Sequence, residues 1–357
     1  MKIKELLAKV WRRGLKFFAN KQYLRYMPAP PVEVLASEWP EYFNNGCNKK
    51  KVLYIAAKYD YGDRSRGISY EEYNFLYTLK NMEDIELIRL DVYSLCHRYG
   101  KDTTNKVIKE VALLNGVDKI LVLLYHDIFK HEMFLELSKS KTFETILWLF
   151  DDDKRYKSTK GLVRCFNKVV TTIPFRHEQR LKKGINSQLA QFAANHFLYK
   201  DYSIERDVDV VFIGQNFGHR QEYIEYLKEN DINVLVYGRG WPNSRRLTQV
   251  EMIELLNRAK VALNFSSSDG NPNLRFLKGR VFEIPATGAL LLTEECEDLD
   301  KYFDIDKEVI TFHDKETLLN KIKNIISDPR LVKSISETGQ LKVIENYTFE
   351  RYIREVL

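Results

Sequence analysis

The chain lacks several features that would assign it to particular classes of protein. Its four cysteines are widely separated and form no Cys-x-x-Cys pair, so the sequence predicts neither a zinc site nor a disulfide framework. No apolar run approaches the roughly 18 residues that a membrane-spanning helix requires, and no cleavable signal is expected after Met1. Internal repeats of solenoid period and low-complexity tracts are also missing. We therefore expect a globular cytosolic protein with reduced thiols.

The charge that is present is unevenly distributed. The 357 residues carry a net charge of +6, of which the first 26 residues carry +7. In this segment apolar residues recur at helical spacing and the cations occupy the other face. We interpret residues 1–27 as a basic amphipathic helix that either lies on an anionic membrane surface or packs on the body of the protein.

From residue 50 onward, short apolar stretches alternate with amphipathic helical patterns. Such alternation is typical of a parallel sheet covered by helices on both faces. A polar segment near residues 195–207 separates two groups of expected strands. These are 52–57, 85–91, 120–125, 145–150 and 169–173, then 208–213, 234–237, 261–265, 289–292 and 309–312. The sequence therefore predicts an α/β protein with Rossmann-like domains at residues 50–200 and 207–340, followed by a C-terminal helix, 341–357.

One segment of the second domain combines groups that suit a nucleotide diphosphate. Lys278 and Arg280 can neutralise a pyrophosphate, the arginine through a planar fork of donors and the lysine as a point charge. The carboxylate of Glu283 can accept hydrogen bonds from both ribose hydroxyls. Gly288 allows a helix to end and turn directly into the apolar run at 289–292, which places these groups at the edge of a sheet. This pattern predicts a nucleotide-sugar site.

The same segment resembles the donor-binding signature of group 1 type glycosyltransferases. The similarity is to the branch named for spore-maturation proteins (CgeB-like), where Lys-Gly-Arg precedes Phe-Glu, and it extends over about the C-terminal 150 residues. It implies the GT-B arrangement, in which an N-terminal acceptor domain and a C-terminal donor domain face each other across a cleft. It also implies a ribose-binding role for Glu283 and a last helix that returns toward the first domain. Related enzymes carry a second glutamate near the donor sugar, whereas this chain has Arg275 at that position.

Other candidates for donor binding follow the expected strands. Gly214 and Arg220 flank the start of a helix, whose free amide groups attract phosphate, although short glycine turns are also ordinary connectors. The resemblance places Gly238 and Trp241 beside the nucleotide base, although a tryptophan is more often plain packing. Because Arg275 replaces the second glutamate, sugar contacts are expected from the polar loop 266–273. The candidates in that loop are Asp269 and Asn273.

Two polar residues of the first domain are candidates for the catalytic base. His126 and Asp151 each follow a buried strand, and either can remove a proton from an acceptor hydroxyl. The alternative is that they cap the following helices or bind sugar hydroxyls. Asp151 and Asp153 also imitate a metal-binding Asp-x-Asp motif. We expect no metal and no cofactor, because Lys278 and Arg280 already supply the positive charge that a leaving diphosphate needs.

The sequence thus predicts a metal-independent glycosyltransferase that uses a nucleotide-diphosphate sugar as donor. The basic N-terminus favours a lipid-linked glycan or a surface polysaccharide as acceptor, and a peripheral location at the inner face of the cell membrane. A protein or nucleic-acid acceptor is an alternative. A groove that binds nucleic acid would spread its cations along the body, which makes that partner unlikely. A non-catalytic scaffold that binds nucleotide is a further alternative.

Overall fold

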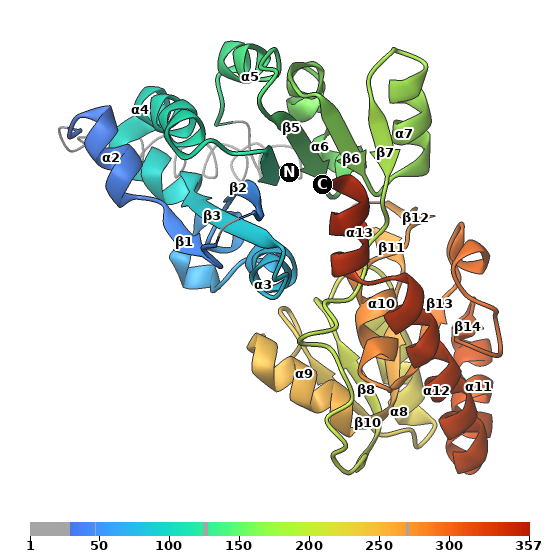
Figure 1. The fold of residues 1–357 in the computed structure, drawn as a ribbon. Coiled ribbons are helices and arrows are strands. Elements are labelled where there is room, and N and C mark those ends of the chain that lie inside the picture. The colour runs from blue at the N-terminus through green and yellow to red at the C-terminus, as the bar shows by residue number, and fades with distance from the viewer. Residues whose placement is uncertain (1–28, 47, 124–127, 269–270) are drawn as a thin grey trace, which may run out of the picture. The chain divides into compact units, whose positions relative to one another are not determined.

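The computed structural model describes residues 29–46, 48–123, 128–268 and 271–357 (Figure 1). The expected helix at residues 1–27 lies outside this part of the chain. Two compact units are present. One comprises the described residues up to Ser69 together with Glu86–Leu147 and Lys157–Asn167, and the other comprises Tyr70–Ile85, Trp148–Tyr156 and Lys168–Leu357. Among the described residues, no helix has the length and apolar character needed to cross a bilayer.

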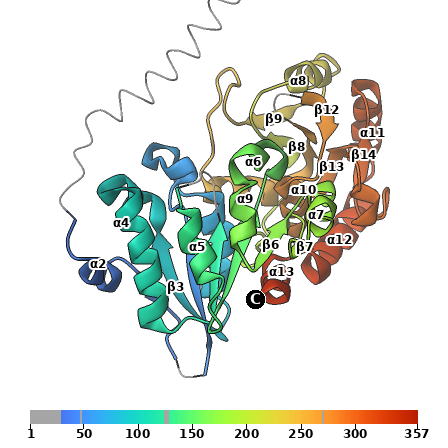
Figure 2. The ribbon, with the colours of Figure 1, turned by 90° about the horizontal axis from the view of Figure 1, so that it is seen from above.

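The first unit is built on parallel strands with helices packed beside them. Its elements are α2 (Val32–Glu38), β1 (Glu41–Phe43), β2 (Lys50–Ala56), β3 (Ile85–Asp91), α4 (Val92–Asn115), β4 (Lys119–Leu123), α5 (His131–Leu137) and most of β5 (Glu144–Leu149). Strands β2 and β4 pair in parallel, while β1 pairs antiparallel with β3. The consecutive residues of β2 from Leu53 to Ala56 are all buried, as expected for a strand covered on both faces. Helix α2 packs on α4 (Figure 2).

The second unit contains two groups of elements. The first group is a π-helical turn at Glu72–Leu76, α3 (Tyr77–Lys80), α6 (Asp152–Thr159), β6 (Lys168–Thr171), α7 (Pro174–Leu181) and β7 (Ser187–Leu189). Strands β6 and β7 pair in parallel. The last helix, α13 (Phe349–Val356), contacts α3, and the ring of Phe349 lies 4.8 Å from that of Phe75.

The second group forms a five-stranded parallel sheet with the order β14-β13-β10-β8-β9. Its elements are β8 (Val208–Ile213), α8 (Arg220–Glu229), β9 (Val234–Tyr237), α9 (Gln249–Arg258), β10 (Ala259–Asn264), the hairpin β11 (Ser267–Ser268) and β12 (Asn271–Arg275), α10 (Gly279–Ala286), β13 (Leu290–Glu294), β14 (Ile310–Phe312), α11 (Lys315–Ser327) and α12 (Pro329–Asn346).

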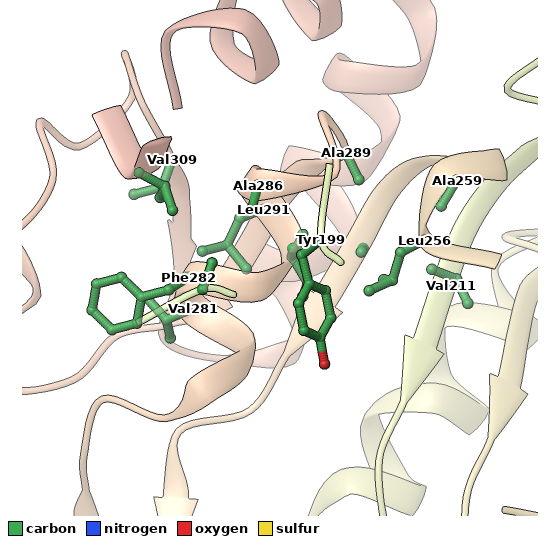
Figure 3. Packing of buried hydrophobic residues seen from close by; sticks show 14 of the residues in the cluster. Tyr199, Val211, Leu256, Ala259, Val281, Phe282, Ala286, Ala289, Leu291 and Val309 are labelled. Atoms are coloured by element: carbon green, nitrogen blue, oxygen red, sulfur yellow. The ribbon is translucent and has the colours of Figure 1, made fainter. Parts of the chain in front are cut away.

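Both faces of this sheet are buried at its central strands, because successive side chains of β8, β10 and β13 enter different hydrophobic clusters. Val211 and Leu291 lie in the cluster drawn in Figure 3, which also contains Phe282 of α10. Their neighbours Phe212 and Leu292 lie in the cluster on the other face. Continuous apolar runs are therefore required in these strands, and such runs are what the sequence pattern detects.

Three helices of this group, α9, α11 and α12, begin at polar residues whose side chains bond their first backbone amides. Thr248 and Glu251 form a capping box at the start of α9, in which each side chain bonds the backbone of the other. Asp314 caps α11 through the amide of Thr317. Asp328 caps α12, with Pro329 in its first turn. These caps fix the helix starts, and hence the lengths of the loops at the sheet edges.

All ten strands expected from the sequence are present, in the expected order along the chain. The ranges 85–91, 208–213 and 234–237 coincide with β3, β8 and β9, and the others differ by one or two residues at their described ends. Strands β1, β7, β11 and β12 were not expected from the sequence. They are short, and β11 and β12 form a hairpin of polar residues, so they lack the apolar runs that identify the central strands.

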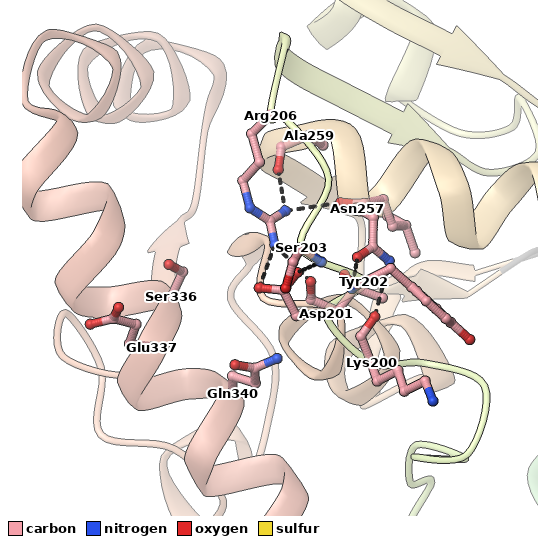
Figure 4. A network of polar contacts seen from close by, with 12 residues as sticks. Lys200, Asp201, Tyr202, Ser203, Arg206, Asn257, Ala259, Ser336, Glu337 and Gln340 are labelled. Carbon is pink, nitrogen blue, oxygen red and sulfur yellow. Dashed lines mark hydrogen bonds and ion pairs between the residues drawn. The ribbon is translucent and has the colours of Figure 1, made fainter.

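The amino end of the five-stranded sheet is held by a polar network around Arg206 (Figure 4). Its guanidinium donates to the carbonyl oxygens of Ala259 at 2.8 Å and Thr287 at 2.8 Å, and it lies 3.6 Å from Asp201. Gly288 has a φ of +75°, and a Cβ at this position would lie 2.7 Å from Nη2 of Arg206. The expected turn at Gly288 is therefore confirmed, and its left-handed backbone favours glycine there.

Candidate functional site

Helix α10 carries the three residues that the sequence predicts for donor binding. Lys278 is the residue before its first turn, and its Nζ donates to the carbonyl oxygen of Ser267 at 2.5 Å. Arg280 forms an ion pair with Glu283, one turn further along the helix. The carboxylate of Glu283 is fully buried, whereas 29% of the Arg280 side chain is exposed. A cation and a buried carboxylate thus lie together at the N-terminal end of a helix, which itself favours anions.

Two tyrosines that the sequence did not identify surround Glu283. A Cβ at Gly279 would lie 3.1 Å from Oη of Tyr70 and 3.3 Å from Oε1 of Glu283, so both oxygens lie over the same glycine. Tyr199 accepts a hydrogen bond from Gln249 at 2.5 Å. Burial, together with the charge of Glu283, raises the pKa of both tyrosines, so both phenols stay protonated at neutral pH.

The oxygens over Gly279 are not satisfied within the protein. Oε1 of Glu283 and Oη of Tyr70 are both buried, and neither has a hydrogen-bond partner among the described residues. Leaving a buried carboxylate oxygen without a donor costs free energy. A ligand hydroxyl that donates to Oε1 would remove this cost. Tyr70 and Tyr199 belong to no sequence motif, and only the folded chain brings them to Glu283.

Gly214 lies in the loop between β8 and α8, and Arg220, which is buried, is the first residue of α8. The guanidinium of Arg220 donates to the carbonyl oxygens of Gln215 at 2.9 Å and Phe265 at 3.2 Å. It also stacks on the ring of Phe217, 3.8 Å from its centroid. Because these contacts use the guanidinium internally, the structure favours a role for Arg220 in holding the loop. A phosphate contact by Arg220 or by Gly214 stays a prediction.

Gly238 and Trp241 join the loops that follow β8 and β9. Gly238 has a φ of +147°, and a Cβ at this position would lie 2.0 Å from the carbonyl oxygen of Gly214. Trp241 donates from Nε1 to that same oxygen at 2.8 Å, and its ring packs against Phe212 in the core. The tryptophan side chain is only 9% exposed. These contacts favour packing, and a role for Gly238 and Trp241 beside the nucleotide base stays a prediction.

Asp151 and its neighbour Asp152 have opposite environments after β5. Asp151 has a φ of +50°, and 53% of its side chain is exposed, 3.8 Å from Arg155. The carboxylate of Asp152 is fully buried and accepts hydrogen bonds from Thr171 at 2.7 Å and Arg180 at 2.8 Å. Left-handed backbone is costly for a residue other than glycine and is often retained at functional sites. The buried Asp152 network holds this turn, and the turn exposes Asp151.

Three other predicted residues are only partly described or not described. His126 and Asp269 lie outside the described residues, so their candidate roles stay predictions. Asn273 lies in β12, within the hairpin that follows β10, and its role also stays a prediction. In the described part of the chain, no group of three His, Cys, Asp or Glu side chains is arranged to hold a metal ion.

Comparison with known proteins finds a family whose sequences resemble the C-terminal part of the chain. Residues 220–357 match the family described as Glycosyl transferase-like. No curated protein sequence matches the chain. The matched region contains α8 and the strands β9, β10, β13 and β14 of the five-stranded sheet. It also contains α10 with Lys278, Arg280 and Glu283. The C-terminal part of the chain is therefore similar to glycosyltransferases in sequence.

Solved structures extend the likeness to most of the chain. Sucrose-phosphate synthase from Thermosynechococcus elongatus has a TM-score of 0.57 at 12% identity, covering 86% of this chain and 98% of its own. A glycosyltransferase from Rickettsia africae has a TM-score of 0.56 at 14% identity, covering 87% and 98%. Anabaena HepE, in complex with UDP-glucose, has a TM-score of 0.55 at 10% identity, covering 86% and 98%. The chain has the GT-B fold, as expected. The spore-maturation branch stays a prediction.

Proposed function

We propose that this protein is a glycosyltransferase that moves a sugar from a nucleotide-diphosphate sugar to a glycan. The observation that carries the proposal is the buried Glu283, whose Oε1 has no donor among the described residues. It lies beside Arg280 and Lys278 at the N-terminal end of α10, in a region similar in sequence to glycosyltransferases. A nucleotide sugar offers ribose hydroxyls to the carboxylate and a diphosphate to the cations. The complex of Anabaena HepE with UDP-glucose supports a donor of this kind.

In the proposed reaction the protein stabilises the departing diphosphate. Lys278 donates to a carbonyl oxygen in this structure and Arg280 pairs with Glu283, so both cations are already held at the helix start. Their positive charge stabilises the negative charge that grows on the nucleoside diphosphate as it leaves the sugar. The backbone amides at the start of α10 add to this effect. Asp151 takes the proton from the acceptor hydroxyl if the reaction inverts the anomeric carbon. Neither a metal nor a cofactor is part of this proposal.

The proposal is tested by thermal shift and hydrolysis with a panel of nucleoside diphosphates and their sugars. We expect one nucleotide to raise the midpoint of unfolding, because ligand that binds only the folded state stabilises it. Its sugar derivative should be hydrolysed slowly without acceptor, at the same rate in EDTA. Stabilisation without hydrolysis would indicate a scaffold that binds nucleotide but transfers nothing. Loss of hydrolysis in EDTA would contradict metal independence, and no stabilisation by any member would contradict the proposed function.

For the acceptor and the location, we propose a lipid-linked or surface glycan at the inner face of the cell membrane. The support is the charge of +7 in the first 26 residues and their amphipathic pattern. We expect the full chain to float with liposomes that contain anionic lipid, and a chain without residues 1–26 to remain at the bottom of the gradient. Equal flotation of the two forms would contradict this proposal. Neutral liposomes serve as the control for the electrostatic contribution.

A further inference from the structure

Glu294 is a buried carboxylate at the carboxyl end of β13, outside the residues used above. Only 1% of its side chain is exposed. Its Oε2 accepts hydrogen bonds from the backbone amides of Ser266 at 2.9 Å and Ser267 at 3.1 Å, which follow the neighbouring strand β10. The hydroxyl of Ser266 donates in turn to the carbonyl oxygen of Glu294 at 2.7 Å. The carboxylate is thus fastened to the loop after β10.

The other oxygen of this carboxylate faces two side chains from other segments. Nε2 of His219, in the loop after β8, lies 3.0 Å from Oε1, and Nη2 of Arg275, at the end of β12, lies 3.3 Å from it. Burial raises the pKa of Glu294, but His219, Arg275 and the amide of Ser267 more than offset this effect, so the pKa is lowered overall. The group is therefore an anion that connects the loops after β8, β10 and β13.

A buried anion at this place needs an explanation, because removing a charge from water is costly. In this cluster 35% of the Arg275 side chain and 20% of the His219 side chain are exposed, so Arg275 is its most accessible member. Among the described residues, Glu294 is the one ion-pair partner of Arg275. A guanidinium has five N–H donors, so a single contact leaves donors that can point to a ligand. The carboxylate therefore orients a half-exposed arginine at the ligand-binding edge of the sheet.

Arg275 lies next to the proposed diphosphate site. Ser267 pairs with Arg275 in the hairpin, and the carbonyl oxygen of the same Ser267 accepts from Lys278. The order Glu283, Lys278, Arg275 along the chain parallels the order ribose, diphosphate, sugar along a donor molecule. We propose that Arg275 donates hydrogen bonds to hydroxyl groups of the donor sugar, and that Glu294 and His219 position it. This inference rests on the proposed function and adds a residue that determines sugar recognition.

The test compares the binding of each nucleotide sugar with that of its own diphosphate by calorimetry, using pairs such as UDP-glucose and UDP or GDP-mannose and GDP. Arg275→Gln is expected to raise the Kd of the nucleotide sugar about tenfold, because sugar hydroxyls lose their donors. The Kd of the diphosphate should stay within about twofold. Arg258→Gln is the matched control, because it breaks the exposed ion pair with Asp207 at the amino end of the same sheet. That control should leave both constants unchanged.

If Glu294 positions Arg275, its substitution should also change the Kd of the nucleotide sugar more than the Kd of the diphosphate. Glu294→Gln should weaken the nucleotide sugar more than the diphosphate, with circular dichroism as the check on folding. If that variant does not fold, Arg275→Lys still tests the inference, since it keeps the charge but loses the fork and should fall between wild type and Arg275→Gln. Equal weakening of sugar and diphosphate, or no weakening of either, by Arg275→Gln would overturn the inference and leave the proposed function standing. If the wild-type protein binds no nucleotide sugar and no diphosphate, both the inference and the proposed function are contradicted.

Discussion

Lys278→Ala is expected to lower the rate of nucleotide-sugar hydrolysis by about 10²- to 10³-fold, the effect of removing one group that stabilises charge in a transition state. The residue precedes the first turn of α10, and its Nζ is held on the carbonyl oxygen of Ser267. Negative charge grows on the diphosphate as the bond to the sugar breaks. A cation fixed beforehand therefore stabilises the transition state more than the ground state. The rate is measured by release of free sugar at saturating donor.

A second lysine provides the control for this substitution. Lys260 forms an exposed ion pair with Asp209 at 2.6 Å, near the amino end of the same sheet. Lys260→Ala removes the same side chain and should leave the rate within about twofold, because exposed ion pairs contribute little. If Lys278→Ala hydrolyses its donor as fast as Lys260→Ala, Lys278 does not act on the leaving group. A loss in donor affinity alone, with the rate at saturation unchanged, would assign it to ground-state binding.

The sequence was sufficient to predict the central strands of the sheets and the end of α10 at Gly288, for related physical reasons. Central parallel strands must be apolar on both faces over their buried length, so β8 and β10 contain the apolar runs 210–213 and 261–263. Lys278, Arg280 and Glu283 are neighbours along the chain, and a single helix keeps them together in the fold. Local order along the chain was therefore enough to predict that these three residues lie together, while their role in donor binding stays a prediction.

Contacts between distant segments could not be predicted in this way. Tyr70 meets Glu283 across more than half of the chain, and Glu294 meets His219 and Arg275 from separate loops. Nothing in the pattern of one segment specifies which residue of another will face it. The two tyrosines and Glu294 therefore emerge only from the folded structure.

The different environments of Asp151 and Asp152 also could not be predicted from the sequence. The sequence places several carboxylates after β5, but it does not say which of them is exposed. The left-handed backbone at Asp151 and the buried bonds from Arg180 and Thr171 to Asp152 decide this point. The structure exposes Asp151 and leaves its catalytic role as a prediction.

Asp151→Asn is expected to lower the rate of sugar transfer or hydrolysis by about 10²- to 10⁴-fold, the usual contribution of a general base. Asparagine has nearly the same shape as aspartate, and it is also enriched in left-handed backbone, so the turn at φ +50° is retained. The substitution therefore removes the proton acceptor without adding strain. Donor binding should be unchanged, because the proposed donor residues lie at α10 and at the end of β12. Steady-state rates and calorimetry on the same preparations separate the two effects.

Asp153→Asn is the matched control, because it removes a carboxylate from the first turn of α6, two residues further along the chain. Loss of that charge weakens a favourable interaction with the helix dipole, which is worth at most about 1 kcal/mol at a surface position. It should therefore change the unfolding midpoint slightly and the rate hardly at all. Equal rates for the two variants would show that Asp151 is not the base. A large loss of rate with Asp153→Asn alone would favour the metal-binding Asp-x-Asp motif. EDTA would then be expected to abolish turnover.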